Sequence, residues 1–273
     1  MQFETQSNDI KVLLSECSFN NNTRIDNGGS VYFRSMGSFV QHKICSLYSQ
    51  IIKNENEEHK GHHCYSDPSD SNKLNFIHDS SIYLCGNRES AKTIIVANGK
   101  ISIKSTNISK CTASLTSGFG ILSDGNVLQC TVDNTTCNSE VLIHYDRGTT
   151  TVSSCNILNN QGRIIITFSA DQLTLDNCYI FKNKWSNDFV LFESQNPIPI
   201  ILQNSYVQSD GYYENYITPN NVVTSNEETS LSLSHFSNSD CEKRNYVDKI
   251  GKDETYYNDC INLFIIMGHS FIV

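Results

Sequence analysis

The chain has 273 residues and a formal net charge of −9, with 20 Lys and Arg against 29 Asp and Glu. This acidic balance disfavours a nucleic-acid partner, because binding to phosphates needs a basic surface. Charged residues make up only 18% of the chain, whereas 31 Asn and 35 Ser are present, which indicates a protein rich in polar turns.

The first predicted element covers residues 14–22, Leu-Ser-Glu-Cys-Ser-Phe-Asn-Asn-Asn. An aliphatic residue, a small residue and a large apolar residue lead into an Asn-rich turn, which is the pattern of a short strand and its turn. Residues 44–48 and 81–85 also have the composition of strands. Residues 53–72 are polar, and we predict an inserted loop there.

The pattern of the first element returns along the chain, with one small residue at the same place in each copy. The small residues of this predicted ladder are Cys17, Thr106, Cys130, Cys155, Cys178 and Ser205. From Thr106 to Ser205 the successive spacings are 24, 25, 23 and 27 residues. Such a nearly constant spacing indicates an internal repeat.

Each repeat unit contains two or three short strands and one small residue at a fixed position. A parallel β-helix explains this pattern, because each unit then forms one coil of the helix. Stacked coils place equivalent side chains about 4.8 Å apart, and a small residue suits a narrow corner of the coil. We therefore expect an all-β fold, a single-stranded right-handed parallel β-helix with coils of ~24 residues, the hand following the chirality of parallel crossovers. A β-sandwich is the alternative, since it also uses short strands with turn signals.

The repeat fades from about residue 209, which divides the chain into a β-helix over residues 1–236 and a C-terminal cap over residues 237–273. A cap is expected because the open end of a solenoid exposes unpaired strand edges. Residues 261–273 are apolar but too short for a bilayer-spanning helix. We interpret them as buried core, with the start of a truncated membrane anchor as the alternative, and no signal peptide is visible.

The 11 cysteines cannot all pair within the chain, because their number is odd. Stacking brings the Cα atoms of the ladder cysteines into disulfide range but leaves their Cβ atoms too far apart. We therefore predict that the ladder cysteines are buried free thiols. Cys241 and Cys260, both in the cap, are the expected disulfide pair if the compartment is oxidising.

Carbohydrate-active β-helix enzymes are the main class of enzyme to consider. Glycoside hydrolysis needs two carboxylates about 5–9.5 Å apart, and the available aspartates are Asp124, Asp133, Asp146, Asp171 and Asp176. Most of them lie in predicted turns, where Asp forms local hydrogen bonds. We expect turn residues and name no catalytic residue.

His59, His62, His63 and Cys64 form the single metal-like cluster of the sequence. An organised fourth ligand is missing, and adjacent histidines do not easily bind one ion. We predict a polar surface loop, with no metal and no cofactor. Sequons begin at Asn21, Asn107 and Asn134. Because Asn107 lies within a predicted strand, we take Asn21 and Asn134, in turns, as the glycosylation acceptors.

The segment Phe19-Asn20-Asn21-Asn22, followed by Gly28-Gly29-Ser30-Val31, resembles the paired motifs of the polymorphic outer-membrane-protein repeat. That repeat combines Phe-x-x-Asn with Gly-Gly-small-aliphatic, and both halves are present only in residues 17–31. The resemblance implies a right-handed parallel β-helix displayed on a cell surface, as in large surface-protein families of parasitic protists. It also implies adhesion or antigenic roles without a cofactor.

We therefore expect a non-enzymatic surface or secreted scaffold, whose partner is an unknown protein or glycan on a host or neighbouring cell. The alternative is a carbohydrate-active β-helix enzyme, pectate-lyase-like or polygalacturonase-like, or an inactive glycan-binding relative. A groove with carboxylates from adjacent coils would favour the enzyme. A flat face with exposed aromatic residues such as Tyr212 and Tyr213 would favour binding.

Overall fold

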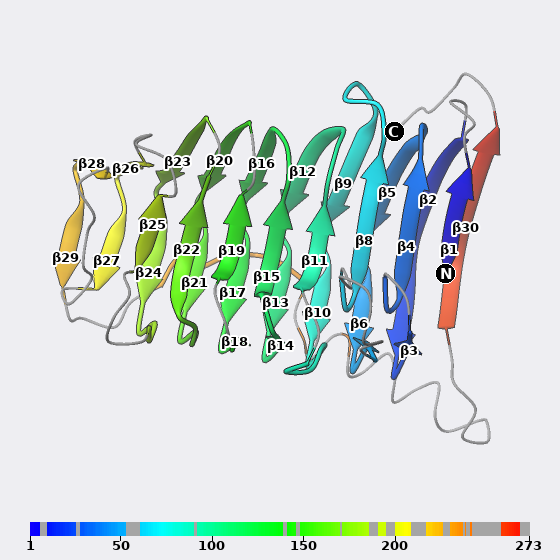
Figure 1. The fold of residues 1–273 in the computed structure, drawn as a ribbon, viewed down its shortest axis with the longest axis horizontal. Coiled ribbons are helices and arrows are strands. Elements are labelled where there is room, and N and C mark those ends of the chain that lie inside the picture. The colour runs from blue at the N-terminus through cyan, green and yellow to red at the C-terminus, as the bar shows by residue number, and fades with distance from the viewer. Residues whose placement is uncertain are drawn as a thin grey trace.

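The structure is a computed structural model that describes residues 1–5, 10–25, 28–52, 61–89, 92–138, 141–145, 148–169, 171–185, 191–194, 200–208, 217–225, 230–236, 238, 241 and 258–267. Parallel strands stack into a β-solenoid of about seven turns (Figure 1). This confirms the predicted parallel β-helix and excludes the β-sandwich.

One side of each coil contributes a strand to an eight-stranded parallel sheet, here called the first face. Its strands are β1 (Gln2–Thr5), β4 (Val31–Ser35), β8 (Cys64–Pro68), β11 (Lys92–Val96), β15 (Thr116–Ile121), β19 (Val141–Tyr145), β22 (Ile164–Phe168) and β25 (Phe192–Ser194). The predicted inserted loop over residues 53–72 is therefore wrong for Cys64–Pro68, which pair with β4 and β11. Residues 53–60 lie outside the described residues.

The rest of each coil belongs to an 18-stranded sheet that bends at a corner into two faces. The middle face consists of β5 (Ser38–His42), β9 (Leu74–His78), β12 (Lys100–Lys104), β16 (Gly125–Leu128), β20 (Thr149–Ser153), β23 (Gln172–Asp176), β26 (Ile200–Gln203) and β28 (Ile217–Asn220). The third face consists of β6 (Cys45–Leu47), β10 (Ser81–Tyr83), β13 (Asn107–Ser109), β17 (Thr131–Asp133), β21 (Asn156–Leu158), β24 (Tyr179–Phe181), β27 (Tyr206–Gln208) and β29 (Val223–Ser225). Strand β2 (Ile10–Asn20) spans both faces, and β3 (Thr23–Arg24), β7 (Gln50–Ile51), β14 (Thr112–Ala113) and β18 (Thr136–Cys137) form two short sheets.

Each coil turns from the middle face to the third face at one residue with positive φ. These residues are Glu16, Lys43, Asp79, Ser105, Gln129, Ser154, Asn177, Asn204 and Asn221. A second corner follows the third face, with positive φ at Asn21, Tyr48, Leu84, Lys110, Asn134, Asn159 and Lys182. Asn tolerates this conformation best among residues with a side chain, which explains the Asn-rich turns of the sequence.

The core is a set of aliphatic ladders inside the coil. Ile103, Val127, Val152, Leu175 and Leu202 occupy one register position of successive middle-face strands, and each is at most 1% exposed. Complete burial of such a side chain contributes about 1.5–3 kcal/mol. Alternation of inward apolar and outward polar residues along each strand thus specifies the stacking register.

The C-terminal segment does not extend the solenoid. Strand β30 (Asn258–Met267) pairs antiparallel with β2 of the first coil, with Cys260 in register with Cys17. Figure 1 shows β30 in red beside the blue N-terminal strands. The described strand of the predicted C-terminal cap therefore covers the opposite, N-terminal end of the stack, and it covers the edge of β2 by strand pairing.

Candidate functional site

The six predicted ladder residues lie at the corner between the middle and third faces, each directly after a positive-φ residue. All six are at most 2% exposed. In five of the six, all except Cys17, the hydroxyl or thiol donates to the carbonyl two residues earlier, as Thr106 Oγ1 does to Lys104 O at 3.0 Å and Cys155 Sγ to Ser153 O at 3.2 Å. A small side chain with a donor therefore satisfies a carbonyl where the backbone turns.

The cysteines of this corner have two different states. Cys130, Cys155 and Cys178 are buried free thiols, whereas Cys17 is disulfide-bonded, so the prediction of a free thiol is wrong at Cys17. Burial raises the pKa of Cys155, and the contact with Cys155, followed by burial, raises the pKa of Cys178. Protonated, buried thiols are poor nucleophiles.

The disulfide of the C-terminal segment differs from the predicted Cys241–Cys260 pair. Cys241 bonds to Cys45 of β6, with the two Cα atoms 5.4 Å apart. The sequence proximity of Cys241 and Cys260 is misleading, because β30 places Cys260 opposite Cys17 while Cys241 lies on the third face.

The second corner contains a buried amide ladder. Asn160 is 0% exposed and Asn183 is 3% exposed, and Asn160 Nδ2 donates to Asn183 Oδ1 at 3.0 Å. Asn160 Oδ1 accepts from both the backbone N–H and the hydroxyl of Thr135. These contacts join three successive coils, so this ladder is structural.

The histidine cluster is buried and is not the predicted surface loop. His62, His63 and Cys64 are all 0% exposed. His63 Nε2 contacts Gln41 Oε1 at 3.1 Å, and Gln41 Nε2 donates to Cys64 Sγ at 3.0 Å. Burial lowers the pKa of His63 to about 3 and raises the pKa of Cys64 to about 12. His59 lies outside the described residues.

Three of the candidate aspartates accept hydrogen bonds from a neighbouring coil: Asp124 lies at a bend as expected, whereas Asp133 and Asp176 are the last residues of β17 and β23 and not turn residues. Asp124 accepts from Thr149 N at 2.6 Å, and Asp133 and Asp176 accept from corner asparagine amides at 2.8 and 2.9 Å. Asp171 is exposed, and Asp146 lies outside the described residues. In the described ranges, no three His, Cys, Asp or Glu side chains gather as metal ligands.

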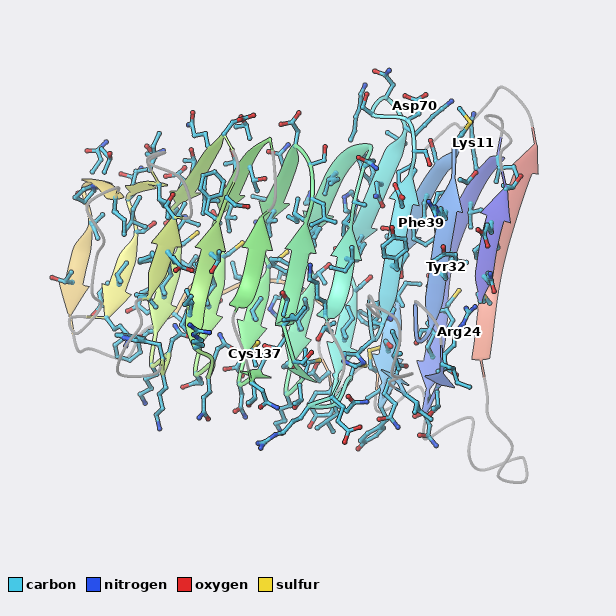
Figure 2. All side chains as sticks on the ribbon, in the orientation of Figure 1. Lys11, Arg24, Tyr32, Phe39, Asp70 and Cys137 are labelled. Carbon is cyan, nitrogen blue, oxygen red and sulfur yellow. A yellow bond between two sulfur atoms is a disulfide. The ribbon has the colours of Figure 1, made fainter. Side chains whose placement is uncertain are left out.

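The outward side of the first face has a buried row of side chains. Tyr32, Tyr65 and Ile95 occupy one register position of β4, β8 and β11 and are 7%, 8% and 0% exposed. The rings of Tyr32 and Tyr65 stack with centroids 5.4 Å apart; Figure 2 labels Tyr32 on this face. This row therefore offers little surface to a partner.

The third face is covered from β6 to β21 by a segment that we call the strap, whose described residues are 230–236, 238 and 241. Leu231 bonds to Asn156 of β21, His235 contacts Thr131 of β17, and Cys241 is bonded to Cys45. Figure 1 shows part of the strap as an orange trace behind the strands. The sequon residue Asn107 is 7% exposed beneath it, whereas Asn21 and Asn134 are exposed at the second corner.

The middle face is the open one among the described parts of the chain. Its central outward row consists of Leu13, Val40, Phe76, Ser102, Asn126, Thr151, Thr174, Ile201 and Thr218. The neighbouring row consists of Ser15, His42, His78, Lys104, Leu128, Ser153, Asp176, Gln203 and Asn220. All 18 side chains are half-buried or exposed. We call these two rows the open face.

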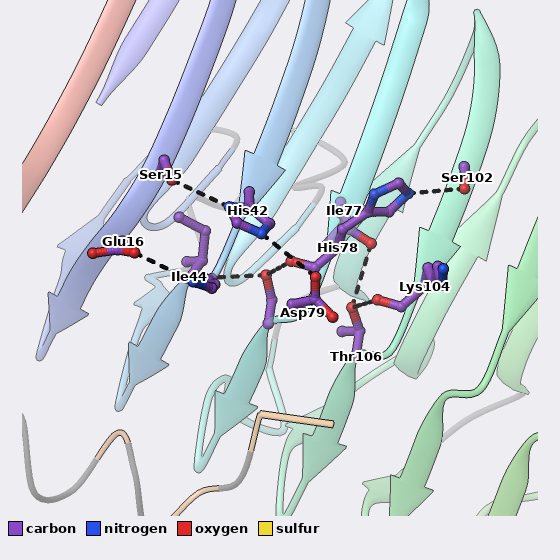
Figure 3. A network of polar contacts seen from close by, with 12 residues as sticks. Ser15, Glu16, His42, Ile44, Ile77, His78, Asp79, Ser102, Lys104 and Thr106 are labelled. Atoms are coloured by element: carbon purple, nitrogen blue, oxygen red, sulfur yellow. Dashed lines mark hydrogen bonds and ion pairs between the residues drawn. The ribbon is translucent and has the colours of Figure 1, made fainter. Parts of the chain in front are cut away.

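A polar network lies at the N-terminal end of the open face (Figure 3). Ser15 Oγ is 3.2 Å from His42 Nδ1, and His42 Nε2 is 3.5 Å from Asp79 Oδ2. Sequence analysis missed this group, because the three residues are 27 and 37 positions apart and meet only through the stacking of consecutive coils. His78 of the same network contacts Ser102 at 2.9 Å, and burial lowers the pKa of His78.

A Ser–His–Asp contact set is the constellation of many hydrolases. Here the ring is turned relative to those enzymes, since the serine faces Nδ1 and the aspartate faces Nε2. The nearby backbone N–H groups of Lys43 and Asp79 already donate to carbonyls of the next coil at 3.1 and 2.9 Å. They are therefore not available to stabilise an oxyanion.

Comparison with known protein families, with curated proteins and with solved structures finds no match to this chain. No helix among the described residues is long and apolar enough to span a membrane. Tyr212 and Tyr213 lie outside the described residues. What the structure has in common with the polymorphic outer-membrane-protein repeat is a parallel β-solenoid.

Proposed function

We propose that the protein is a non-enzymatic interaction scaffold, secreted or displayed on a cell surface, that binds a glycan through its open face. The observation that carries the proposal is the asymmetry of the solenoid. The outward row of Tyr32, Tyr65 and Ile95 on the first face is buried, and the strap covers the third face from β6 to β21, whereas both outward rows of the middle face are accessible along their whole length. A rigid face that is already ordered binds without a large cost in conformational entropy.

The chemistry of the open face favours a glycan over a protein. From β16 onward its side chains are mainly hydroxyls and amides, including Asn126, Thr151, Thr174, Gln203 and Asn220. These groups donate and accept hydrogen bonds, as sugar hydroxyls require, and they repeat once per coil. Large aromatic anchors, which are typical of protein–protein hot spots, are limited in the two rows to Phe76.

The proposed location rests on the cysteines. Cys45 and Cys241 form a disulfide, and Cys17 is disulfide-bonded as well. Disulfides persist in oxidising compartments and are rare in the cytosol. The exposed sequon residues Asn21 and Asn134 are compatible with the secretory route.

The test is binding of the purified chain to a glycan array, together with labelling of intact cells by a membrane-impermeant biotin reagent. The open-face variant carries Thr151→Glu and Thr174→Glu, which are register partners on β20 and β23. The matched control carries Thr112→Glu and Thr136→Glu, register partners on β14 and β18. We expect the open-face variant to lose at least about tenfold in affinity, with no loss in the control.

Equal binding by both variants would place the ligand elsewhere and contradict the proposal. Binding only to protein ligands would replace the glycan by a protein partner. Absence of the chain from the labelled surface fraction and from the medium would contradict the location.

A second candidate, a carbohydrate-active hydrolase, is favoured by the contacts of Ser15, His42 and Asp79. Turnover of an acetylated or polymeric glycan, abolished by Ser15→Ala and retained by Ser153→Ala, would support the enzyme. Ser153 provides the control because it occupies the same row three coils beyond His78.

A further inference from the structure

The strap begins as an irregular chain lying along the solenoid. Ser230–Phe236 forms neither strand nor helix. Its exposure alternates, since Ser230, Ser232 and Ser234 are exposed whereas Leu231 and Leu233 are half-buried. One side of an extended chain therefore faces the third face, and the other side faces solvent.

The coils under the strap contact it mainly through one outward row of polar residues, and Ser109, beside that row, accepts one further bond from Asn238 at 2.6 Å. Asn156 binds the main chain of Leu231, donating from Nδ2 to the carbonyl at 2.9 Å and accepting from the N–H at 3.0 Å. A side-chain amide that pairs with both backbone groups recognises a peptide without depending on its sequence, as main-chain bonds do when a peptide adds to a sheet edge.

Two strap side chains add sequence-dependent contacts. His235 Nε2 lies 2.9 Å from the hydroxyl of Thr131. Asn238 accepts from Ser81 at 2.6 Å and from Asn107 at 2.8 Å, so it joins two successive coils. The outward row of the third face therefore binds three features of the strap: the main chain of Leu231, the side chain of His235 and the side chain of Asn238.

Covalent and apolar anchoring is concentrated at one end of the strap. The Cys45–Cys241 bond lies in a small apolar cluster with Leu47, against which Tyr83 and Phe236 pack. Between Leu231 and Asn238 the strap contacts the third face through hydrogen bonds as well as through Phe236, and each hydrogen bond contributes only about 0.5–1.5 kcal/mol. Water can replace such bonds when the strap leaves.

We propose that the strap is a disulfide-latched cover, and that the row beneath it (Ser81, Asn107, Thr131 and Asn156) is a second interaction surface for an extended peptide. The four row residues are 0%, 7%, 9% and 5% exposed while the strap is in place. An external dithiol opens the latch: it transfers two electrons and two protons, the Cys45–Cys241 bond becomes two thiols, and the dithiol becomes a disulfide. This surface is separate from the open face, so the proposal is independent of the glycan scaffold.

The first experiment tests the latch by hydrogen exchange of the full chain. The Cys241→Ser variant removes this bond without altering Cys17. We expect backbone amides 231–236 to exchange at least about tenfold faster than in the oxidised wild type. The buried thiols Cys130 and Cys155 should react with a thiol-modifying reagent as slowly in the variant as in the wild type, which shows that the solenoid stays folded. Equal exchange in both proteins would overturn the latch, and Cys45→Ser provides an independent second variant.

The second experiment tests the surface with a biotinylated synthetic peptide of residues 230–240. Because the tethered strap competes at high effective concentration, the receptor carries His235→Ala, Asn238→Ala and Cys241→Ser, which weaken its own strap but leave the row intact. We expect this receptor to bind the peptide, and the oxidised wild type to bind it at least about tenfold more weakly.

Two controls make the result specific to the row. A peptide with Ala at the positions of His235 and Asn238 should bind about tenfold more weakly than the unchanged peptide. Adding Asn156→Ala to the receptor should have a similar effect. Failure of the receptor to bind the peptide, or indifference to both controls, would overturn the proposed surface.

Discussion

The buried amide of Asn160 gives the sharpest test of how this solenoid is held together. Its Nδ2 donates to Val132 O at 2.9 Å and to Asn183 Oδ1 at 3.0 Å. Its Oδ1 accepts from the N–H and the hydroxyl of Thr135, both at 3.0 Å. The side chain is 0% exposed, so the amide uses two donors and two acceptor positions without water.

Asn160→Ala removes all four side-chain bonds at once. The N–H of Thr135 and the carbonyl of Val132 lose their bonds to this amide in a buried environment, at a cost of about 1–3 kcal/mol each. We therefore expect the free energy of unfolding to fall by about 4 kcal/mol, measured by urea denaturation and far-ultraviolet circular dichroism. The expected loss of stability is large because buried polar groups that have lost part of their hydrogen bonds cannot form new ones with water.

The neighbouring Asn159 supplies the matched control. It is exposed, has φ of 55°, and donates from Nδ2 to Asp133 Oδ1 at 2.8 Å. Asn159→Gly keeps the positive φ accessible, so we expect a change of less than about 1 kcal/mol. If Asn160→Ala were no more destabilising than Asn159→Gly, the claim that the amide ladder couples the coils would be refuted.

Three further predictions follow from single groups. Cys241→Ser removes a cross-link between residues 196 positions apart, and should lower the free energy of unfolding by up to about 5 kcal/mol in non-reducing denaturation. The pKa of His63 is about 3 in the folded chain and 6.5 in the unfolded chain, so the unfolded chain binds more protons between these pH values. The free energy of unfolding should therefore fall by about 3 kcal/mol from pH 7 to pH 4. His63→Gln should make the free energy of unfolding less dependent on pH in this range. Gly37→Ala should destabilise the fold by about 1–3 kcal/mol or more in thermal melts, because a Cβ there would collide with the backbone carbonyl oxygen of Ile10.

The parallel stack could be predicted because its signal is local and periodic. From the coil of Thr106 to that of Ser205, each coil repeats an inward aliphatic residue, a positive-φ corner and a small residue with a donor. From Thr106 to Ser205 the coil length varies only between 23 and 27 residues, so the repeat is visible without any knowledge of the structure. The physical requirement for a donor at the corner explains why Thr, Cys and Ser alternate there.

The early coils were harder to recognise, because their lengths and corner residues vary. Ile44 and Ser80 occupy the corner position after Lys43 and Asp79, but they are 36 residues apart, and Ile44 has no side-chain donor. The polar appearance of residues 53–72 concealed strand β8 (Cys64–Pro68). For the same reason the network around His42 could not be predicted, since it needs the register of these coils.

The strap and the N-terminal position of β30 have no periodic signal, because their contacts join residues far apart in the sequence. In every solenoid, stacked coils interact only with their neighbours and leave open strand edges at both ends. The strap and β30 reduce both effects. A single C-terminal segment that crosses β21, β17, β13, β10 and β6 and then pairs with β2 covers one edge. It also links distant coils to each other. Since it occupies the third face to do so, the middle face remains the accessible side, which is why we place the primary ligand there.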